Sequence, residues 1–138
     1  MMRDLIEKSG VVPVVTIKRS EEAVPIAKAL VSGGVAVVEI TFRTEAAEEA
    51  IRRIHEEVPD ITVGAGTVRS VEQLERATGA GAKFIVTPGF NRKVVEAAVK
   101  RHMPIYPGVV TPGEIENVAE YGICTVKFFP AEASGGTA

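Results

Sequence analysis

The sequence predicts an α/β fold in which helices cover a parallel sheet, and three observations support this class. Apolar, β-branched runs of strand length start at Val11, Val35, Ile61, Phe84, Ile105 and Ile123. Their starts are separated by 24, 26, 23, 21 and 18 residues, about the length of one strand and one helix. No short hairpin turn joins one run to the next, so we expect parallel strands. Six strands and five helices are therefore predicted.

The first two helical segments carry signals at their ends. The first follows Ser20 and contains Pro25, which leaves its start open. In the second, Thr44 is the candidate N-cap and Pro59 stops the helix. Its apolar residues recur at intervals of three and four: Ala47, Ala50, Ile51, Ile54 and Val58.

The last three helical segments are marked in the same way. Ser70 with Gln73, and Thr111 with Glu114, have the spacing of capping boxes. Pro112 stands at the favoured first helical position. Apolar stripes identify the fourth and fifth helices: Val94, Val95, Ala98 and Val99, then Ile115, Val118 and Ala119.

Length and charge narrow the class of protein. We expect residues 1–138 to form a single domain. Lys and Arg number 16 against 18 Asp and Glu, and the net charge of −2 comes without a polybasic block, which argues against nucleic acid or membrane as partners. The apolar runs are too short to span a bilayer. The segment MMRDLIEKSG lacks the apolar core of a signal peptide, and Cys124 is the only cysteine, so we expect a cytoplasmic protein.

Charged residues lie inside two of the predicted strands. Because side chains alternate across a strand, Glu39 and Arg43 share the face opposite to the apolar residues of their run. The apolar face must contact the helices, so Glu39 and Arg43 are expected to point into the interior. The same alternation turns Lys127 inward in the last run.

A hydroxyl is expected near the same interior. Thr67 ends the third run with the parity of Val63 and Ala65. Gly64 and Gly66 in this run allow a neighbouring element or a ligand to come close. We therefore expect one acid, one guanidinium, one amine and one hydroxyl to converge.

The burial of several charges calls for an explanation, because an unpaired buried charge costs several kcal/mol. One explanation is a structural ion pair, most simply Glu39 with Lys127 or Arg43. The favoured explanation is catalysis, since an enclosed lysine near another cation is partly a neutral amine that can attack a ketone. Glu39 would carry protons for imine formation, and Arg43 offers a forked donor for a carboxylate.

Other motifs are weaker. The sequence GAGTVR, residues 64–69, lacks the third glycine of a dinucleotide fingerprint. Cys124 is expected to be a small buried hydrophobe. No group of His, Cys or carboxylate residues has the spacing of a metal site, so neither a metal nor a cofactor is expected.

Five segments together resemble one enzyme family. They are VEITFRT (38–44), GAGTV (64–68), TPG (87–89), PGVVTP (107–112) and KFFPAE (127–132). In this order they are similar to the 2-keto-3-deoxy-6-phosphogluconate aldolases, also called 4-hydroxy-2-oxoglutarate aldolases. The similarity covers almost the whole chain.

The resemblance implies a role for each candidate residue. Lys127 would be the Schiff-base lysine and Glu39 the general acid and base. Arg43 and Thr67 would hold the carboxylate of the pyruvate moiety. The implied enzyme is a class I, metal-independent aldehyde-lyase that releases pyruvate together with glyceraldehyde 3-phosphate or glyoxylate. The resemblance also implies a TIM (β/α)8 barrel, a homotrimer and the last step of the Entner-Doudoroff route.

The chain differs from the family in length. Its residues cover about six β/α units, so we expect an incomplete barrel domain over residues 1–138 that lacks the loops where such barrels bind phosphate. Eight units of roughly 25 residues would make a protein of about 200 residues, of which this sequence would be a fragment. Two other functions stay open: a phosphosugar isomerase-type barrel enzyme, and a truncated, non-catalytic fragment in which Glu39 and Lys127 are merely paired.

Overall fold

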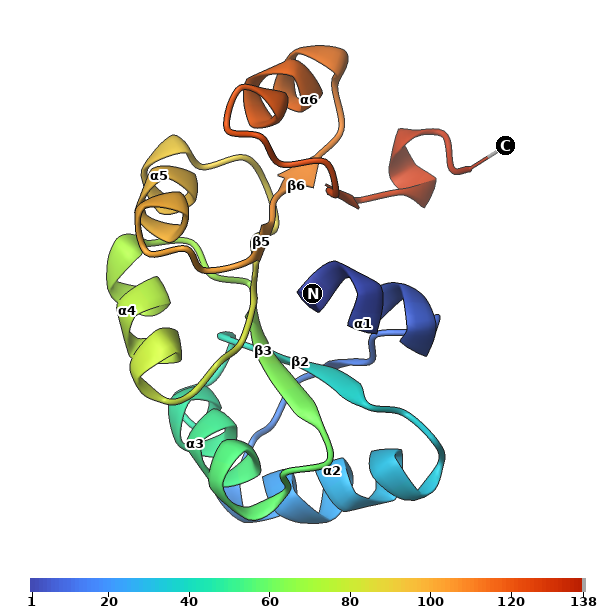
Figure 1. Ribbon diagram of the computed structural model, residues 1–138, viewed down its shortest axis with the longest axis vertical. Coiled ribbons are helices and arrows are strands. Elements are labelled where there is room, and N and C mark those ends of the chain that lie inside the picture. The colour runs from blue at the N-terminus through green and yellow to red at the C-terminus, as the bar shows by residue number, and fades with distance from the viewer. Residues whose placement is uncertain (138) are drawn as a thin grey trace.

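The computed structural model describes residues 1–137, in which helices and short strands alternate (Figure 1). The α-helices are α1 (Met2–Ser9), α2 (Ala23–Ser32), α3 (Ala47–Glu57), α4 (Val71–Gly79), α5 (Arg92–Lys100) and α6 (Pro112–Ala119). The strands are β1 (Val14–Val15), β2 (Val37–Thr41), β3 (Thr62–Gly66), β4 (Ile85–Val86), β5 (Ile105–Tyr106), β6 (Gly108–Val109) and β7 (Lys127–Phe128). Short 3-10 helices span Ser20–Glu22 and Glu132–Ser134.

The strands form two parallel sheets. Strands β1 to β5 pair in chain order, and β6 pairs with β7. The longest register joins β2 to β3, where Val37 lies opposite Thr62 and Thr41 lies opposite Gly66. The predicted α/β class with a parallel sheet is confirmed.

The number of strands differs from the prediction because the fifth run is divided at Pro107. Residues 105–106 belong to the large sheet and residues 108–109 to the small one. Proline has no backbone N–H to donate to a ladder. Its carbonyl instead accepts a hydrogen bond of 2.9 Å from the Lys127 amide, which starts the pairing of β6 with β7.

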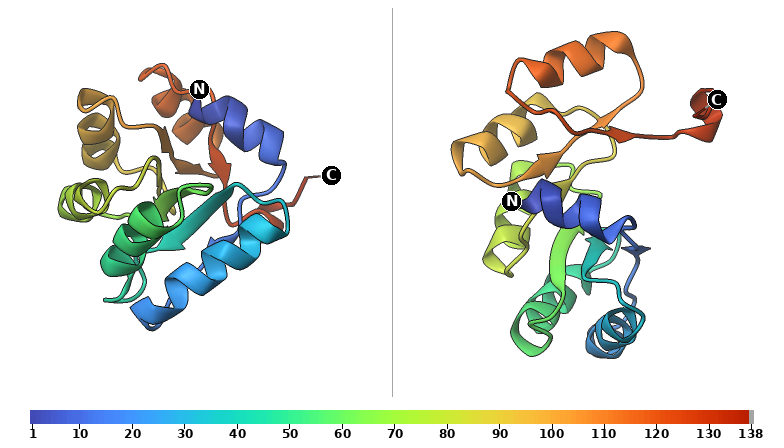
Figure 2. Two further views of the ribbon diagram at one scale, coloured as in Figure 1. Left: turned by 60° about the horizontal axis from the view of Figure 1, so that its bottom comes forward. Right: turned by 45° about the vertical axis from the view of Figure 1, so that its right-hand side comes forward.

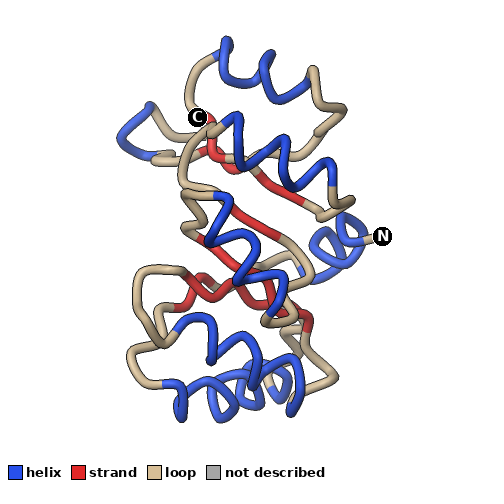
Figure 3. Tube along the Cα trace, turned by 90° about the vertical axis from the view of Figure 1, so that its left-hand side faces the viewer, coloured by secondary structure: helices blue, strands red, loops and turns tan. Residues whose placement is uncertain are grey.

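Helices cover both faces of the sheet, unequally. Figure 3, seen from the side of α3, α4 and α5, shows these helices in front of the strands. They bury the main core, which includes Ile40, Ala65 and Ile85. Helix α1 lies on the opposite face in both views of Figure 2. The larger set of outer helices explains why most buried apolar residues face them.

Helix α1 was not predicted, and it closes the inner face of the sheet. Its Leu5 and Ile6 pack against an inner cluster of Val37, Phe84 and Val86. All three cluster residues are at most 5% exposed, whereas no residue of α1 is fully buried. The helix therefore acts as a cover over this side of the strands.

The predicted helix ends are largely confirmed. Ser70 accepts a hydrogen bond from the Gln73 amide, and Thr111 and Glu114 form a reciprocal capping box with Pro112 in the first turn. The prediction for Thr44 was wrong: α3 begins at Ala47, and the Thr44 hydroxyl donates to the Ile17 carbonyl. Thr44 thus ties the loop after β2 to the segment after β1.

Candidate active site

Glu39 is the buried acid of the inner face. It is the central residue of β2, with Val37 and Thr41 on the same face, and only 3% of it is exposed. Its Oε1 atom has no hydrogen-bond partner among the described residues. Burial raises the pKa of Glu39, and the positive charges of Lys127 and Arg43 oppose this shift. The carboxyl is therefore poised to hold or release a proton.

Lys127 brings an amine to the same place from a strand far along the chain. Its Nζ lies 3.9 Å from Glu39 Oε1 and 4.8 Å from the ring centroid of Phe129. The separation of the two charged groups suits an ion pair but is too long for a hydrogen bond. Each group thus keeps donor or acceptor capacity for a ligand. The predicted inward direction of Glu39 and Lys127 is confirmed.

The two groups face a small cavity of about 220 Å³. Its other walls are mostly apolar and come from α1, from strands β4 and β5, and from the chain just before β1, β4 and β7: Ile6, Val12, Phe84, Val86, Tyr106, Thr125 and Val126. Apolar surroundings strengthen the electrostatic interaction of an amine and a carboxylate with a bound molecule. Such a pair is suited to attack on a carbonyl by the amine and to proton transfer by the acid.

Arg43 and Thr67 lie beyond the ends of their strands. Arg43 was expected to point into the interior, but it follows β2 in a loop and is exposed, and it does not line the cavity. Its positive charge still opposes the rise in the pKa of Glu39. Thr67 follows β3, is partly buried and has a φ of 56°. The prediction that Thr67 shares an inward face with Val63 and Ala65 was wrong, because Val63 and Ala65 belong to the core on the helix side of the sheet. A left-handed residue breaks the alternation, so strand parity does not give the direction of this side chain.

Part of the cavity wall, formed by Tyr106 and Phe84, was not predicted from the sequence. Tyr106 and Phe84 meet edge to face, with ring centroids 6.0 Å apart. The parity of Tyr106 in its run, opposite to the outward Ile105, was the available signal. Burial raises the pKa of the Tyr106 phenol. The spacing of Met2, Leu5 and Ile6 was the corresponding signal for α1.

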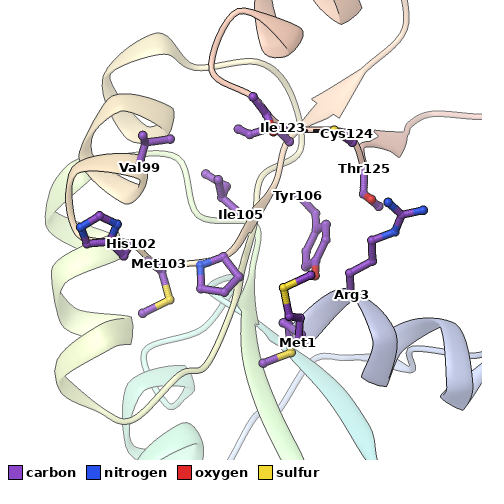
Figure 4. A pocket seen from close by; sticks show the side chains of 13 residues that line it. Met1, Arg3, Val99, His102, Met103, Ile105, Tyr106, Ile123, Cys124 and Thr125 are labelled. Carbon is purple, nitrogen blue, oxygen red and sulfur yellow. Dashed lines mark hydrogen bonds between the residues drawn. The ribbon is translucent and has the colours of Figure 1, made fainter.

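A second pocket of about 500 Å³ lies where the start of α1 approaches β5 (Figure 4). Tyr106 and Thr125 line both cavities. Cys124 also lines the larger pocket and is exposed, so the expectation that it is buried was wrong. The reason is that the last run becomes a strand only at Lys127, which leaves Cys124 outside the sheet.

Neither a metal-binding cluster nor a membrane-spanning helix is found within residues 1–137. No group of three or more His, Cys, Asp or Glu side chains in this range could hold a metal ion. None of the helices described there combines the length and the apolar character that crossing a membrane requires.

Fold and site together define a class of protein and then a family. Parallel strands with helices outside and charged groups inside are the features of a β/α barrel, although the described strands do not close into one. The family of KDPG and KHG aldolases, named for 2-keto-3-deoxy-6-phosphogluconate and 4-hydroxy-2-oxoglutarate, matches residues 2–138. The chain belongs to this family.

Individual relatives agree with this assignment. The 2-dehydro-3-deoxy-phosphogluconate aldolase of Treponema pallidum (strain Nichols) is 51% identical over 135 residues, which are 98% of this chain and 64% of the relative. The KHG/KDPG aldolase of Escherichia coli (strain K12) is 51% identical over 132 residues, which are 96% of this chain and 62% of the relative.

A solved structure agrees as well. The KDPG aldolase of Legionella pneumophila, with pyruvate captured at low pH as a covalent carbinolamine intermediate, matches with a TM-score of 0.91 at 39% identity. The match covers 96% of this chain and 64% of that one. The expected barrel type is confirmed, and the chain spans 62% to 64% of the length of these three relatives.

The burial of Glu39 predicts a pH-dependent effect on stability. Because its pKa is raised, the folded protein keeps a proton that the unfolded chain has lost, so the contribution of Glu39 is greatest in acid and falls as pH rises through the raised pKa. Glu39→Gln should raise the midpoint of thermal unfolding at neutral pH, and the gain should vanish below about pH 4.

The control for this experiment is Glu116→Gln, which changes an exposed glutamate on α6 and should leave the midpoint unchanged. A lower midpoint for Glu39→Gln at neutral pH would show that attraction to Lys127 outweighs the cost of burial.

Proposed function

We propose that the protein is a class I aldolase in which Lys127 forms a Schiff base with a 2-keto acid. The observation that carries the proposal is the pair of Lys127 Nζ and the buried, unpartnered Glu39 Oε1, 3.9 Å apart and facing one cavity. In a chain of the KDPG and KHG aldolase family, this pair supplies a nucleophile and a proton carrier.

The proposed reaction begins at the keto carbon of the substrate. The Lys127 amine adds to this carbon, and Glu39 gives the proton with which the carbinolamine loses water to become a protonated imine. Glu39, directly or through a water, then takes the proton of the C4 hydroxyl. The C3–C4 bond breaks, its electron pair moves to the imine, and the aldehyde leaves. Protonation of the enamine and hydrolysis of the imine release pyruvate and restore Lys127.

The proposed substrates are 2-keto-3-deoxy-6-phosphogluconate, which would give glyceraldehyde 3-phosphate, and 4-hydroxy-2-oxoglutarate, which would give glyoxylate. The names of the Treponema and Escherichia relatives support these substrates. The carbinolamine with pyruvate in the Legionella enzyme supports the first covalent step. We propose that neither metal nor cofactor is needed, because the imine itself accepts the electron pair.

Arg43 and Thr67 are proposed to bind the carboxylate of the pyruvate moiety. Arg43 lies near enough to Glu39 to influence its pKa. A guanidinium gives two parallel donors to a carboxylate, and the Thr67 hydroxyl would give a third.

The non-catalytic alternative has one observation in its favour, since Glu39 and Lys127 meet the distance of an ion pair. The lack of a hydrogen bond to Glu39 Oε1 argues against a purely structural pair, which would normally satisfy this atom. Family membership disfavours the isomerase.

Trapping with borohydride tests the central claim. Incubation of the purified protein with pyruvate and borohydride should add one reduced pyruvate per chain, measured by intact mass. Lys127→Ala should abolish the adduct because the nucleophile is gone, whereas Lys83→Ala, which removes an exposed lysine before β4, should retain it. An equal adduct on the Lys127 variant, or none on the wild-type protein, would refute imine chemistry at this residue.

Arg43 provides a separate prediction about binding. Arg43→Ala should raise KM for the keto acid by roughly tenfold or more, because charge-assisted hydrogen bonds contribute about 1.5 to 3 kcal/mol. Arg43→Lys should recover only part of this loss, since an ammonium lacks the fork. Steady-state kinetics give the result, with Arg92→Ala on the exposed start of α5 as control. A fall in kcat at constant KM would assign Arg43 to another step.

Assembly and compartment complete the proposal. By resemblance to the family, we propose a homotrimer in the cytoplasm. Native mass spectrometry at micromolar concentration should then give three times the mass of one chain. A single monomeric species would contradict the proposed assembly without bearing on the imine.

A further inference from the structure

The carboxylate of Glu39 occupies the space that a side chain at position 66 would fill. In the pairing of β2 with β3, Glu39 lies opposite Gly64 and Thr41 lies opposite Gly66. A Cβ atom added to Gly66 would overlap Oε1, Cδ and Cγ of Glu39. The Glu39 side chain therefore extends from its position opposite Gly64 toward the carboxyl end of β3, where it lies against the backbone of Gly66.

The backbone of Gly66 does not itself require glycine. Its φ lies outside the left-handed region, unlike that of Gly34 or Gly81. Hydrogen bonds do not hold the acid either, because Oε1 has no partner and Lys127 stays 3.9 Å away. Gly66 is distinguished by its lack of a side chain, which leaves the space that the Glu39 carboxylate occupies.

We propose that Gly66 is a positioning residue that holds the Glu39 carboxylate by shape, so that both oxygens stay available for proton transfer at the Lys127 imine. The inference rests on the proposed function. Fixing an acid by packing avoids the hydrogen bonds that would commit its lone pairs or its proton to the protein. A displacement of about 1 Å in such a group costs on the order of a hundredfold in rate.

Gly64 offers a matched comparison on the same strand and the same face. The three atoms nearest to a Cβ there all belong to the ring of Phe84, a buried apolar residue, whereas those nearest to a Cβ at Gly66 all belong to Glu39. Both substitutions to alanine add one methyl group to the inner face of β3. Only the change at Gly66 should move the carboxylate.

The experiment compares Gly66→Ala with Gly64→Ala in the wild-type protein. For Gly66→Ala, pyruvate should still be trapped on Lys127 after prolonged incubation, although more slowly because Glu39 also serves imine formation, while kcat for cleavage falls about a hundredfold and KM stays within about twofold. The acid limb of the pH profile should move to lower pH, because the displaced carboxylate loses burial. The groups that face it are Lys127, Arg43 and the Tyr106 phenol across the cavity.

Gly64→Ala should lower the midpoint of thermal unfolding and leave the pH profile in place. A second variant, Glu39→Asp, distinguishes displacement of the acid from a general loss of structure. Glu39→Asp withdraws the carboxylate by one methylene, so in its presence Gly66→Ala should cost little further activity. The double variant should also fold if Gly66→Ala alone does not, because the overlap is relieved.

Three results would overturn the proposal: an unchanged pH profile and kcat for Gly66→Ala, equal losses for the two alanine variants, or additive losses in the double variant. Failure of the wild-type protein to trap pyruvate would instead refute the proposed function, which separates the two claims.

Discussion

The burial of one carboxylate in the middle of β2 is the constraint on which the site depends. An ionised acid in an apolar sheet costs free energy, and here two nearby cations offset the cost only in part, so the pKa of Glu39 is raised. Three features surround Glu39. Strand β3 has no side chain where the acid lies, α1 covers the inner face, and β7 carries the amine. The result is a mostly apolar cavity that holds one acid and one amine.

Alternation along β2 was enough to predict the direction of Glu39, because this strand is five residues long and regular. The same reasoning succeeded for Lys127, which starts a strand of its own. It failed for Thr67, which lies one residue past the end of β3 with a left-handed φ. The alternation of side chains therefore predicts their direction only within the paired part of a strand. Binding residues often lie just beyond that part.

Other features depended on contacts that a pattern does not contain. Helix α1 is short, and the role of its apolar residues is evident only from their packing against the inner cluster. The chain before β7 has the composition of a strand but no ladder partner, which leaves Cys124 exposed. In contrast, the capping signals at Ser70 and Thr111 were reliable because cap and first turn lie within four residues.

The division of the fifth run at Pro107 places the acid and the amine on separate sheets. Besides the chain itself, these sheets are joined at Thr87, whose hydroxyl donates to the Gly89 carbonyl and accepts from the Gly108 amide at 3.3 Å. Glu39 and Lys127 thus lie on two sheets that are linked through Pro107 and through the Thr87 hydroxyl. Sequence changes at these links can therefore alter the distance between the acid and the amine, although the residues involved touch neither group.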